Sequence, residues 1–496
     1  MSTNNQNAPR PSIRLDRITE TLVSRIGEKR TSILRQLAGN WSEEMRFWRY
    51  LSNERVSVPG LVERSTAGIG EAVAGRPVLS IQDGSTISLC GRLAARKGFL
   101  AINGDGPPGF QLHPALVLDA ETGSCLGLGD VEVQDEPRAG GDKRWCMRQD
   151  ALGKKSGTWL RCGMAARARL GAAASVTHIA DREADFFEMM LEFGQNKWET
   201  EHFLIRSNAD RQLGHLPGRG KTPYKGSPEV AIWHQGLEHP PLLVPHRSTL
   251  APMMRLLPVR AVWDLPLPAT CKRSARTARV VLRFVEQVPI CRPNDGYARI
   301  YQGQPLPGSI KVNVVEIREV CMAGADPNDE PILWRLFTSH PVKNIEDARQ
   351  IVQWYAWRWK IELLFAAAKS RGLDLEHAQI QYADRLKKLA ILVAMAAVTV
   401  IQLIQARDGA SNQPITDAFS TEDIALLRQI SPKLEGKTLK QQNPHPKQSL
   451  AFAAWVIARL GGWKGYKTHR PPGIGTMSRG LQRFFQIKYD QFLLSG

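Results

Sequence analysis

Several short and nearly continuous apolar segments in the first half of the chain stop at, or one residue before, a charged residue. The segments are 78–81, 115–118, 176–180 and 203–205, and the charged residues are Asp83, Asp119, Asp181 and Arg206. Short apolar runs that alternate with longer helical patterns are typical of buried strands in an α/β fold. Open α/β sheets bind ligands beyond the carboxyl ends of their strands, so a carboxylate there is a candidate site residue. The plain alternative is that each Asp only begins a turn.

A helical segment in the second half of the chain carries an unusual polar stripe. The pattern predicts a helix that begins near Asn344, a good N-cap, and that Gly372 can end. At about 100° of rotation per residue, one stripe of this helix holds Tyr355, Arg358, Glu362 and Lys369. An acid beside three phosphate-binding groups suits a phosphodiester and a bound metal ion. An ion pair between Arg358 and Glu362 within the helix is the alternative interpretation.

The composition divides the chain into a core and two helical flanks. Residues 1–70 and 376–496 have helical patterns, and 71–375 form the predicted α/β core. Within that core, residues from about 211 to 330 are rich in Gly, Pro and strand-like stretches, which predicts a mostly β insertion.

The chain is strongly basic, with a formal net charge of +18 and a pI of about 9.8. Residues 431–496 hold eleven Lys and Arg against two acidic residues, and another basic cluster runs from Arg206 to Lys225. Several basic surfaces favour a long polyanion such as double-stranded DNA, because each neutralised phosphate releases counterions. A basic protein without a nucleic-acid partner is the alternative.

The cysteines, the first residues and the longest apolar run bear on where the protein is expected to reside. The seven cysteines form no C-x-x-C pair, so we expect reduced thiols in the cytoplasm and no zinc ribbon. Residues 1–12 are polar, and we expect them to be disordered. The apolar run 389–401 is too short to cross a bilayer, which predicts a buried helix and no membrane partner.

The spacing of Tyr355, Arg358, Glu362 and Lys369 resembles the Y-R-E-K signature of the IS-four family of bacterial insertion-sequence transposases, which includes the Tn-five transposase. Residues 180–185, Ala-Asp-Arg-Glu-Ala-Asp, are similar to the family motif around its second catalytic Asp, and 81–89 to the segment around its first. Residues 334–339 resemble the family segment with a base-trapping Trp. Less specific similarity lies in four terminal segments, 27–35, 46–56, 459–463 and 481–494.

This resemblance implies a DDE transposase with a ribonuclease-H-like catalytic core. Asp83, Asp181 and Glu362 would bind two Mg²⁺ ions, with Mn²⁺ as a substitute, and catalyse nicking, hairpin formation and resolution, and strand transfer. The expected DNA contacts are Lys29, Arg30, Arg35, Arg206, Trp334, Tyr355, Arg358 and Lys369. The implied partners are terminal inverted repeats, target DNA and a second copy of the chain in a paired-end complex. The implied location is the bacterial cytoplasm, at the nucleoid.

Other functions and roles remain open on the sequence alone. The chain could be a non-catalytic DNA-binding inhibitor derived from a transposase, a nuclease of the same fold, or a recombinase that uses Tyr355 as a nucleophile. The N-terminal helices could form a purely structural bundle, and Trp334 could be a core residue. An apolar helix face near the C-terminus is expected to form the dimer, with ordinary core packing as its alternative; it comprises Leu481, Phe484, Phe485, Tyr489 and Phe492.

Overall fold

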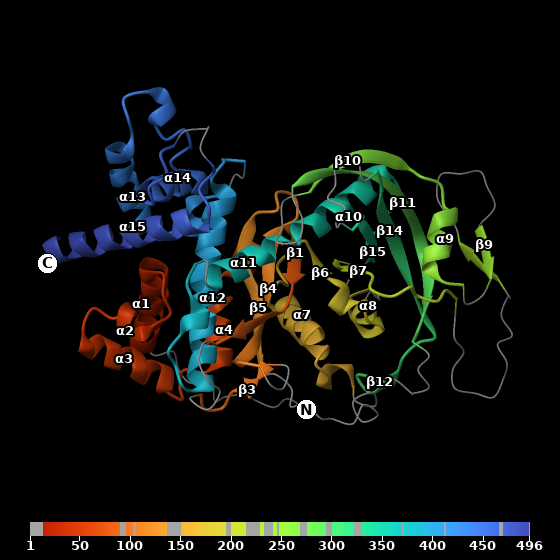
Figure 1. Cartoon of the computed structure of the whole chain (residues 1–496), viewed down its shortest axis with the longest axis horizontal. Helices are drawn as coiled ribbons and strands as arrows, with labels where there is room; N and C mark the ends of the chain where they lie inside the picture. The colour runs from red at the N-terminus through yellow and green to blue at the C-terminus, as the bar shows by residue number, and fades with distance from the viewer. Residues whose placement is uncertain are drawn as a thin grey trace.

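The chain is a mixed α/β protein in which one large mixed sheet is flanked on one side by a group of helices (Figure 1). The computed structural model describes residues 13–89, 96–102, 106–135, 150–194, 200–214, 229–232, 242–245, 248–267, 275–293, 300–321, 330–369, 372–410, 413–465 and 470–495. The predicted disorder of 1–12 therefore lies outside the described residues. The α/β class predicted from the apolar segments is confirmed.

Five strands form the centre of the sheet, in the spatial order β5-β4-β1-β6-β7. Their bounds are β1 (Pro77–Gln82), β4 (Pro108–Asp119), β5 (Cys125–Asp135), β6 (Ser175–Ala180) and β7 (Glu201–Arg206). β1, β4 and β5 pair in antiparallel fashion, whereas β1, β6 and β7 run parallel to one another. Helix α7 (Gly157–Arg169) connects β5 to β6, and α8 (Phe187–Gly194) connects β6 to β7. β1 and β6 are buried along almost their whole length, as strands covered on both faces must be.

The region predicted as a β insertion extends this sheet. Its described elements are β8 (Glu229–Ile232), β9 (Leu242–Pro245), α9 (Leu250–Leu256), β10 (Ala261–Leu267), β11 (Arg276–Cys291), β12 (Ile300–Tyr301), β13 (Gln304–Pro305) and β14 (Ser309–Cys321). β10, β11 and β14 join β7 through β15 (Leu333–Thr338), so the insertion and the core share one sheet. β2 (Ser85–Ser88) and β3 (Leu100–Ala101) pair with β4 on the other side.

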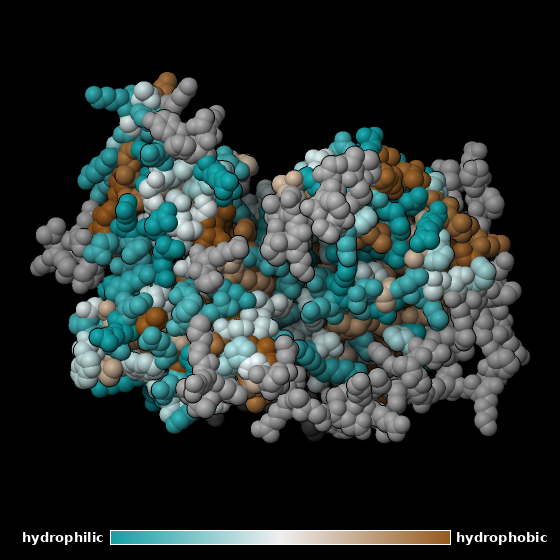
Figure 2. Space-filling model, in the orientation of Figure 1, coloured by the Kyte–Doolittle hydropathy of each residue, from teal (hydrophilic) through white to brown (hydrophobic). Residues whose placement is uncertain are grey.

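Strand β10 lies at one end of this extended sheet. Its outward positions include Asp264 and Pro266, residue types that prevent a strand edge from pairing with another chain. Three apolar side chains nearby are nonetheless exposed: Leu256 (66%), Val259 (44%) and Val262 (46%). Apolar surface is visible over this part of the insertion in Figure 2.

The N-terminal and C-terminal helices form a group that includes α12 (Ala383–Ala406) at its centre, although not every helix of the group touches α12. They are α1 (Ile13–Lys29), α2 (Leu34–Leu37), α3 (Trp41–Ser52), α4 (Val58–Ser65), α5 (Ile69–Ala72), α13 (Thr421–Leu434), α14 (Leu450–Leu460) and α15 (Ile474–Ser495). α12 extends beyond the apolar run at 389–401 and is long and apolar enough to cross a membrane by those two criteria alone. However, 78% of its apolar window is buried inside the chain, as in the core helix of a soluble fold. It contacts α1, α4, α11, α14, α15 and β5.

The apolar face predicted to form a dimer is used inside the chain where the structure describes it. Leu481 is 2% exposed and Phe484 is fully buried, and the Phe484 ring packs edge-on against Phe419 with centroids 5.9 Å apart. The side chains of Tyr489 and Phe492 lie outside the described residues. For Leu481 and Phe484 the prediction of a dimer contact is therefore corrected to core packing, because α15 lies directly against α1 and α14.

Two glycines allow α14 and α15 to cross at backbone contact. A Cβ atom added to Gly480 would lie 1.8 Å from the carbonyl oxygen of Ile457 in α14, and one added to Gly461 would lie 2.1 Å from that of Thr476. Because both obstacles are main-chain atoms, a larger residue at Gly480 requires the helices to separate.

Gly480→Ala is therefore expected to lower the free energy of unfolding by at least about 2 kcal/mol, as overpacking against a rigid neighbour does. Gly475→Ala is the matched control in the same helix, because its Cβ would meet only the Arg479 side chain at 3.6 Å. Urea unfolding followed by fluorescence compares the two variants with the wild type. Equal unfolding midpoints for Gly480→Ala and Gly475→Ala would contradict the close crossing.

Candidate active site

The first two predicted carboxylates follow neighbouring parallel strands. β1 and β6 pair with Pro77 beside Ser175 and Ile81 beside Ile179. Continuing this register by two residues places Asp83 beside Asp181, at the shared carboxyl edge of two strands about 4.8 Å apart. The side chain of Asp181 also accepts a hydrogen bond of 2.8 Å from the amide of Glu183, which caps a short 3₁₀ turn.

Arg206 belongs to the same edge of the sheet. β6 and β7 pair with Ala180 beside Ile205, so the next residues, Asp181 and Arg206, are also neighbours. The guanidinium of Arg206 donates to the carbonyl oxygen of Leu333 at 3.0 Å. Burial lowers the pKa of Arg206, and the Tyr355 hydroxyl opposes this shift. Part of the basic cluster that begins at Arg206 lies outside the described residues.

The predicted long helix is interrupted in the structure. α10 (Ile345–Trp357) begins at the predicted cap, where the Asn344 side chain accepts from the amide of Asp347, but α11 (Lys360–Ala368) is a separate helix. Between them the amide of Arg358 bonds to the carbonyl of Tyr355, and that of Ile361 to Arg358, which is the tighter i to i−3 pattern. The predicted single helix is thus two helices, although both residues between them, Arg358 and Trp359, keep right-handed helical dihedral angles.

The interruption accompanies a buried ion pair between Arg358 and Asp83. Nη1 of Arg358 lies 2.6 Å from Oδ2 of Asp83, and these side chains are only 8% and 14% exposed. Oδ1 of Asp83 accepts a second hydrogen bond, of 2.8 Å, from the amide of Gly84. Arg358 thus pairs with a carboxylate on the sheet, and this contact, rather than an ion pair with Glu362, accounts for its position.

Electrostatic interaction links the three predicted carboxylates. Burial raises the pKa of Asp83 to about 6, against the effect of Arg358, and the negative charges of Asp181 and Glu362 raise it further. Glu362 lies exposed in the first turn of α11. Across the described ranges no three His, Cys, Asp or Glu side chains are close enough to hold one metal ion together as they stand.

Tyr355 and Trp334 form a buried aromatic pair behind this site. Tyr355 is 2% and Trp334 7% exposed, and their rings meet edge-on with centroids 5.1 Å apart. Burial raises the pKa of Tyr355. A DNA base cannot reach the Trp334 face in this arrangement, and a hydroxyl buried in this way is a poor nucleophile for a recombinase. The structure therefore favours the alternative of a core role for Trp334.

Lys369 lies beyond the end of α11 and approaches the sheet near Asp83. Its ammonium donates to the carbonyl oxygen of Thr86 in β2 at 2.7 Å and lies 3.8 Å from a carboxylate oxygen of Glu376. It is thus held close to the strand that follows Asp83.

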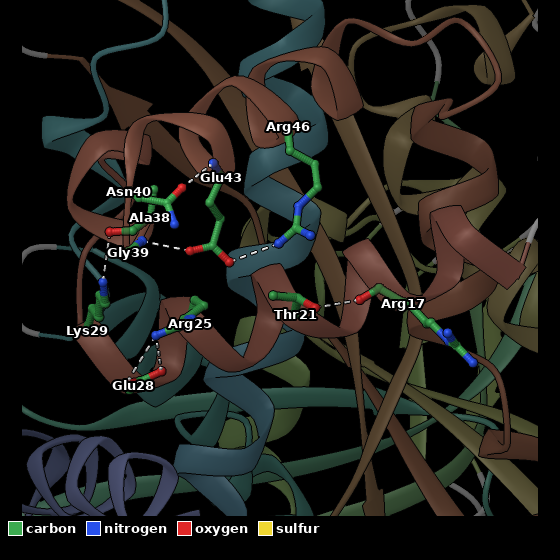
Figure 3. Close-up of polar contacts among 10 residues, drawn as sticks. All are labelled: Arg17, Thr21, Arg25, Glu28, Lys29, Ala38, Gly39, Asn40, Glu43 and Arg46. Atoms are coloured by element: carbon green, nitrogen blue, oxygen red, sulfur yellow. Dashed lines mark hydrogen bonds and ion pairs between the residues drawn. The ribbon is translucent and has the colours of Figure 1, made fainter. Parts of the chain in front are cut away.

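The three predicted N-terminal DNA contacts differ in accessibility. The Lys29 ammonium donates to the carbonyl oxygen of Ala38 at 3.1 Å, which closes the turn between α1 and α3 (Figure 3). Arg30 is half-buried, and its pKa is lowered by burial and by the nearby charge of Arg479. Arg35 is exposed. Arg35 is therefore the best placed of the three for an external partner.

Two polar groups near the site were not predicted from the sequence. Asp185, in the same motif as Asp181, accepts from the amide of Asn208 at 2.6 Å and pairs with Arg211 at 2.7 Å. It fixes the segment that follows β7. Behind Asp83, the His113 ring lies 3.2 Å from the Gln82 amide oxygen, and burial lowers the pKa of His113 to about 3. The carboxylate at the end of the 180–185 motif was the available signal for the first of these roles.

The fold and this edge of the sheet define an α/β protein with carboxylates and cations gathered at the ends of parallel strands. No family model matches the chain. Among solved structures, the chain is similar to a piggyBac transposase synaptic complex with hairpin DNA, at 12% identity and a TM-score of 0.35, over 95% of this chain and 84% of that one.

Proposed function

We propose that the chain is a DNA transposase with Asp83, Asp181 and Glu362 as its catalytic carboxylates. The observation that carries the proposal is the register of β1 and β6, which brings two Asp residues side by side at the ends of parallel strands. The negative charge of Glu362, which belongs to helix α11, also raises the pKa of Asp83. The sequence signature described above independently selects the same three residues.

The strand arrangement supports a ribonuclease-H-like core for this enzyme. Three antiparallel strands (β5, β4 and β1) are followed by two parallel ones (β6 and β7), and helices α7 and α8 make the connections. This order agrees with such a core, and the sheet edge with Asp83 and Asp181 is where α/β folds place their chemistry.

Mg²⁺ is the cofactor that fits the donor groups, with Mn²⁺ as a substitute. Carboxylate oxygens are the ligands that these hard cations prefer. Burial and like charges both raise the pKa of Asp83, and a divalent cation would remove both penalties. Asp83, Asp181 and Glu362 would hold two ions, which activate a water or 3′-hydroxyl nucleophile and stabilise the leaving oxygen when bound. Arg358 would have to release Oδ2 of Asp83 for that oxygen to bind metal.

Cations around the carboxylates would hold the scissile phosphate. Nε of Arg358 is buried without a hydrogen-bond partner among the described residues, so this donor would meet a phosphate oxygen only when the side chain moves away from Asp83. Arg206 and Lys369 lie near the same edge and carry further positive charge. These three residues would position the DNA strand, whereas the carboxylates would support the reaction itself.

The proposed partner is double-stranded DNA, both the terminal inverted repeats and the target, in agreement with the formal net charge of +18. Two transposon ends must be joined together, so a homodimer with two-fold symmetry is the proposed assembly on DNA. The proposed location is the bacterial cytoplasm, in association with the nucleoid.

Arg35→Ala is expected to weaken binding to the inverted repeat. It should also reduce the slope of log affinity against log salt concentration by about one unit, as the loss of one phosphate contact does. Lys29→Ala should instead destabilise the protein, because the Lys29 ammonium closes a turn. Fluorescence anisotropy with labelled repeat DNA at several salt concentrations measures the first effect. An unchanged affinity and salt slope for Arg35→Ala would exclude α2 from the DNA interface.

The proposed function is tested by incubating the purified protein with the DNA repeats that flank its gene, with Mg²⁺ or with EDTA. Nicked, hairpin and joined products that appear only with Mg²⁺ are expected. Nicks without joined products would indicate a nuclease, and DNA binding without nicks would indicate a non-catalytic DNA-binding protein. Either of these two results would overturn the proposal of a transposase.

A further inference from the structure

The carboxylate of Asp83 already has a partner on each of its oxygens. Nη1 of Arg358 donates to Oδ2 at 2.6 Å, and the amide of Gly84 donates to Oδ1 at 2.8 Å. A guanidinium and a divalent cation both bind carboxylate oxygens. At Oδ2, a metal ion would therefore have to compete with Arg358.

Burial makes Arg358 a strong competitor for this oxygen. The side chains of Arg358 and Asp83 are 8% and 14% exposed, so water and salt screen their attraction little. Burial lowers the pKa of Arg358, but the Tyr355 hydroxyl and the carboxylates of Asp83 and Asp181 together raise it, so the guanidinium keeps its charge. One cation thus acts on two of the three candidate metal ligands.

A DNA phosphate would offer Arg358 another anionic partner. The contact with Asp83 uses Nη1, and Nε is buried without a hydrogen-bond partner in the part of the chain that the structure describes. A guanidinium that turns from a carboxylate to a phosphate stays paired, and it can donate to the phosphate through two N–H groups. The exchange would leave Oδ2 of Asp83 free.

We propose that Arg358 lowers the metal affinity of Asp83 until a DNA phosphate binds its guanidinium and frees Oδ2. The proposal rests on the proposed function and deepens it, because it gives the order in which DNA and metal bind. Without DNA, Arg358 weakens metal binding but does not abolish it, since excess cation still competes for Oδ2. DNA then raises the metal affinity of the site, and by linkage the metal raises the DNA affinity by the same factor.

The test measures Mn²⁺ binding to the full-length protein without DNA, by electron paramagnetic resonance of the free ion. Arg358→Gln keeps a hydrogen-bond donor near Asp83 but removes the charge. It is expected to bind Mn²⁺ at least about tenfold more tightly than the wild type, a difference of about 1.4 kcal/mol, because the metal then neutralises an unpaired buried carboxylate. Arg358→Lys, which keeps a positive charge, should bind more weakly than Arg358→Gln. Arg182→Gln is the matched control, because Arg182 is an exposed cation directly after Asp181, and its affinity should equal that of the wild type.

A second measurement on the wild type needs no variant. Repeat DNA that already ends at the cleavage position, with a 3′-dideoxy end, cannot react. With a terminal phosphate, this DNA should raise the Mn²⁺ affinity of the wild type more than the same DNA without that phosphate does.

The outcomes separate this proposal from the proposed function. Equal Mn²⁺ affinities of DNA-free wild type and Arg358→Gln would overturn the role of Arg358, and so would a wild-type affinity that the phosphorylated DNA leaves unchanged. Mg²⁺-dependent cleavage by the wild type would in both cases leave the proposed function intact. A wild type that binds neither Mn²⁺ nor repeat DNA would overturn both.

Discussion

Asp83→Asn, Asp181→Asn and Glu362→Gln are each expected to lower Mg²⁺-dependent DNA cleavage by several orders of magnitude. Each amide keeps the shape of the side chain but removes a negative metal ligand. The loss would be large because the proposed metal ions would supply both nucleophile activation and stabilisation of the leaving oxygen. Binding to repeat DNA should survive, because the basic surfaces are unchanged and the site becomes less negative.

Single-turnover cleavage and gel-shift affinity, measured on the same preparations, separate catalysis from binding. Glu183→Gln is the matched control, because Glu183 is an exposed carboxylate two residues after Asp181. It should cleave at the wild-type rate. Arg358→Ala and Lys369→Ala should lose affinity for the scissile strand as well as rate, since these cations would hold phosphate. Substantial cleavage by any one amide variant would remove that carboxylate from the site.

Asp83→Asn is also expected to stabilise the metal-free protein near neutral pH. The pKa of Asp83 is raised from 3.8 to about 6 in the folded protein, mainly by burial and then by Asp181 and Glu362, against Arg358. The folded state therefore binds this proton more tightly than the unfolded state does. As pH rises from about 4 to 6, ionisation of Asp83 lowers the free energy of unfolding of the wild type. Above pH 6 this loss approaches its full value of about 3 kcal/mol. The side chain is only 14% exposed, so solvent screening reduces this figure little.

Urea unfolding in EDTA at pH 4, 5, 6 and 7.5 measures this effect. The difference in free energy of unfolding between Asp83→Asn and the wild type should be near zero at pH 4 and largest at pH 7.5. Added Mg²⁺ should then reduce this difference in free energy of unfolding, because it should stabilise only the wild type. A variant that is less stable than the wild type at pH 7.5 would mean that the ion pair with Arg358 outweighs the burial cost.

The strand ends of the site were predictable because the local sequence pattern of a short apolar run predicts a buried strand. The apolar runs before Asp83 and Asp181 form β1 and β6, which are buried at every position but the first, as short continuous runs predict. Their relative register is different, since it depends on the pairing of segments almost one hundred residues apart. Only the structure shows that this register aligns the two Asp residues.

The interruption before the helix with Glu362 could not be predicted from sequence periodicity. The pattern around Tyr355, Arg358 and Glu362 fits one continuous helix, yet a tight turn separates α10 from α11. A long-range contact, Arg358 with Asp83, accompanies that turn, and no local pattern encodes it. Burial of Trp334 is a long-range effect of the same kind, whereas the bond from Lys29 to Ala38 is local. Residue types thus predicted the candidate chemistry, while tertiary packing decides which side chains are accessible.

Metal preference gives the most direct test that Asp83, Asp181 and Glu362 bind the catalytic ions. Each residue is replaced by Cys in turn, and cleavage of repeat DNA is measured in Mg²⁺ and in Mn²⁺. A thiolate is a soft ligand that binds Mg²⁺ poorly and Mn²⁺ better, so at least one Cys variant should be inactive in Mg²⁺ and regain cleavage in Mn²⁺. The wild type should cleave in both. If the three Cys variants show the same ratio of Mn²⁺ to Mg²⁺ activity as the wild type, or none in either metal, the account of this site is contradicted.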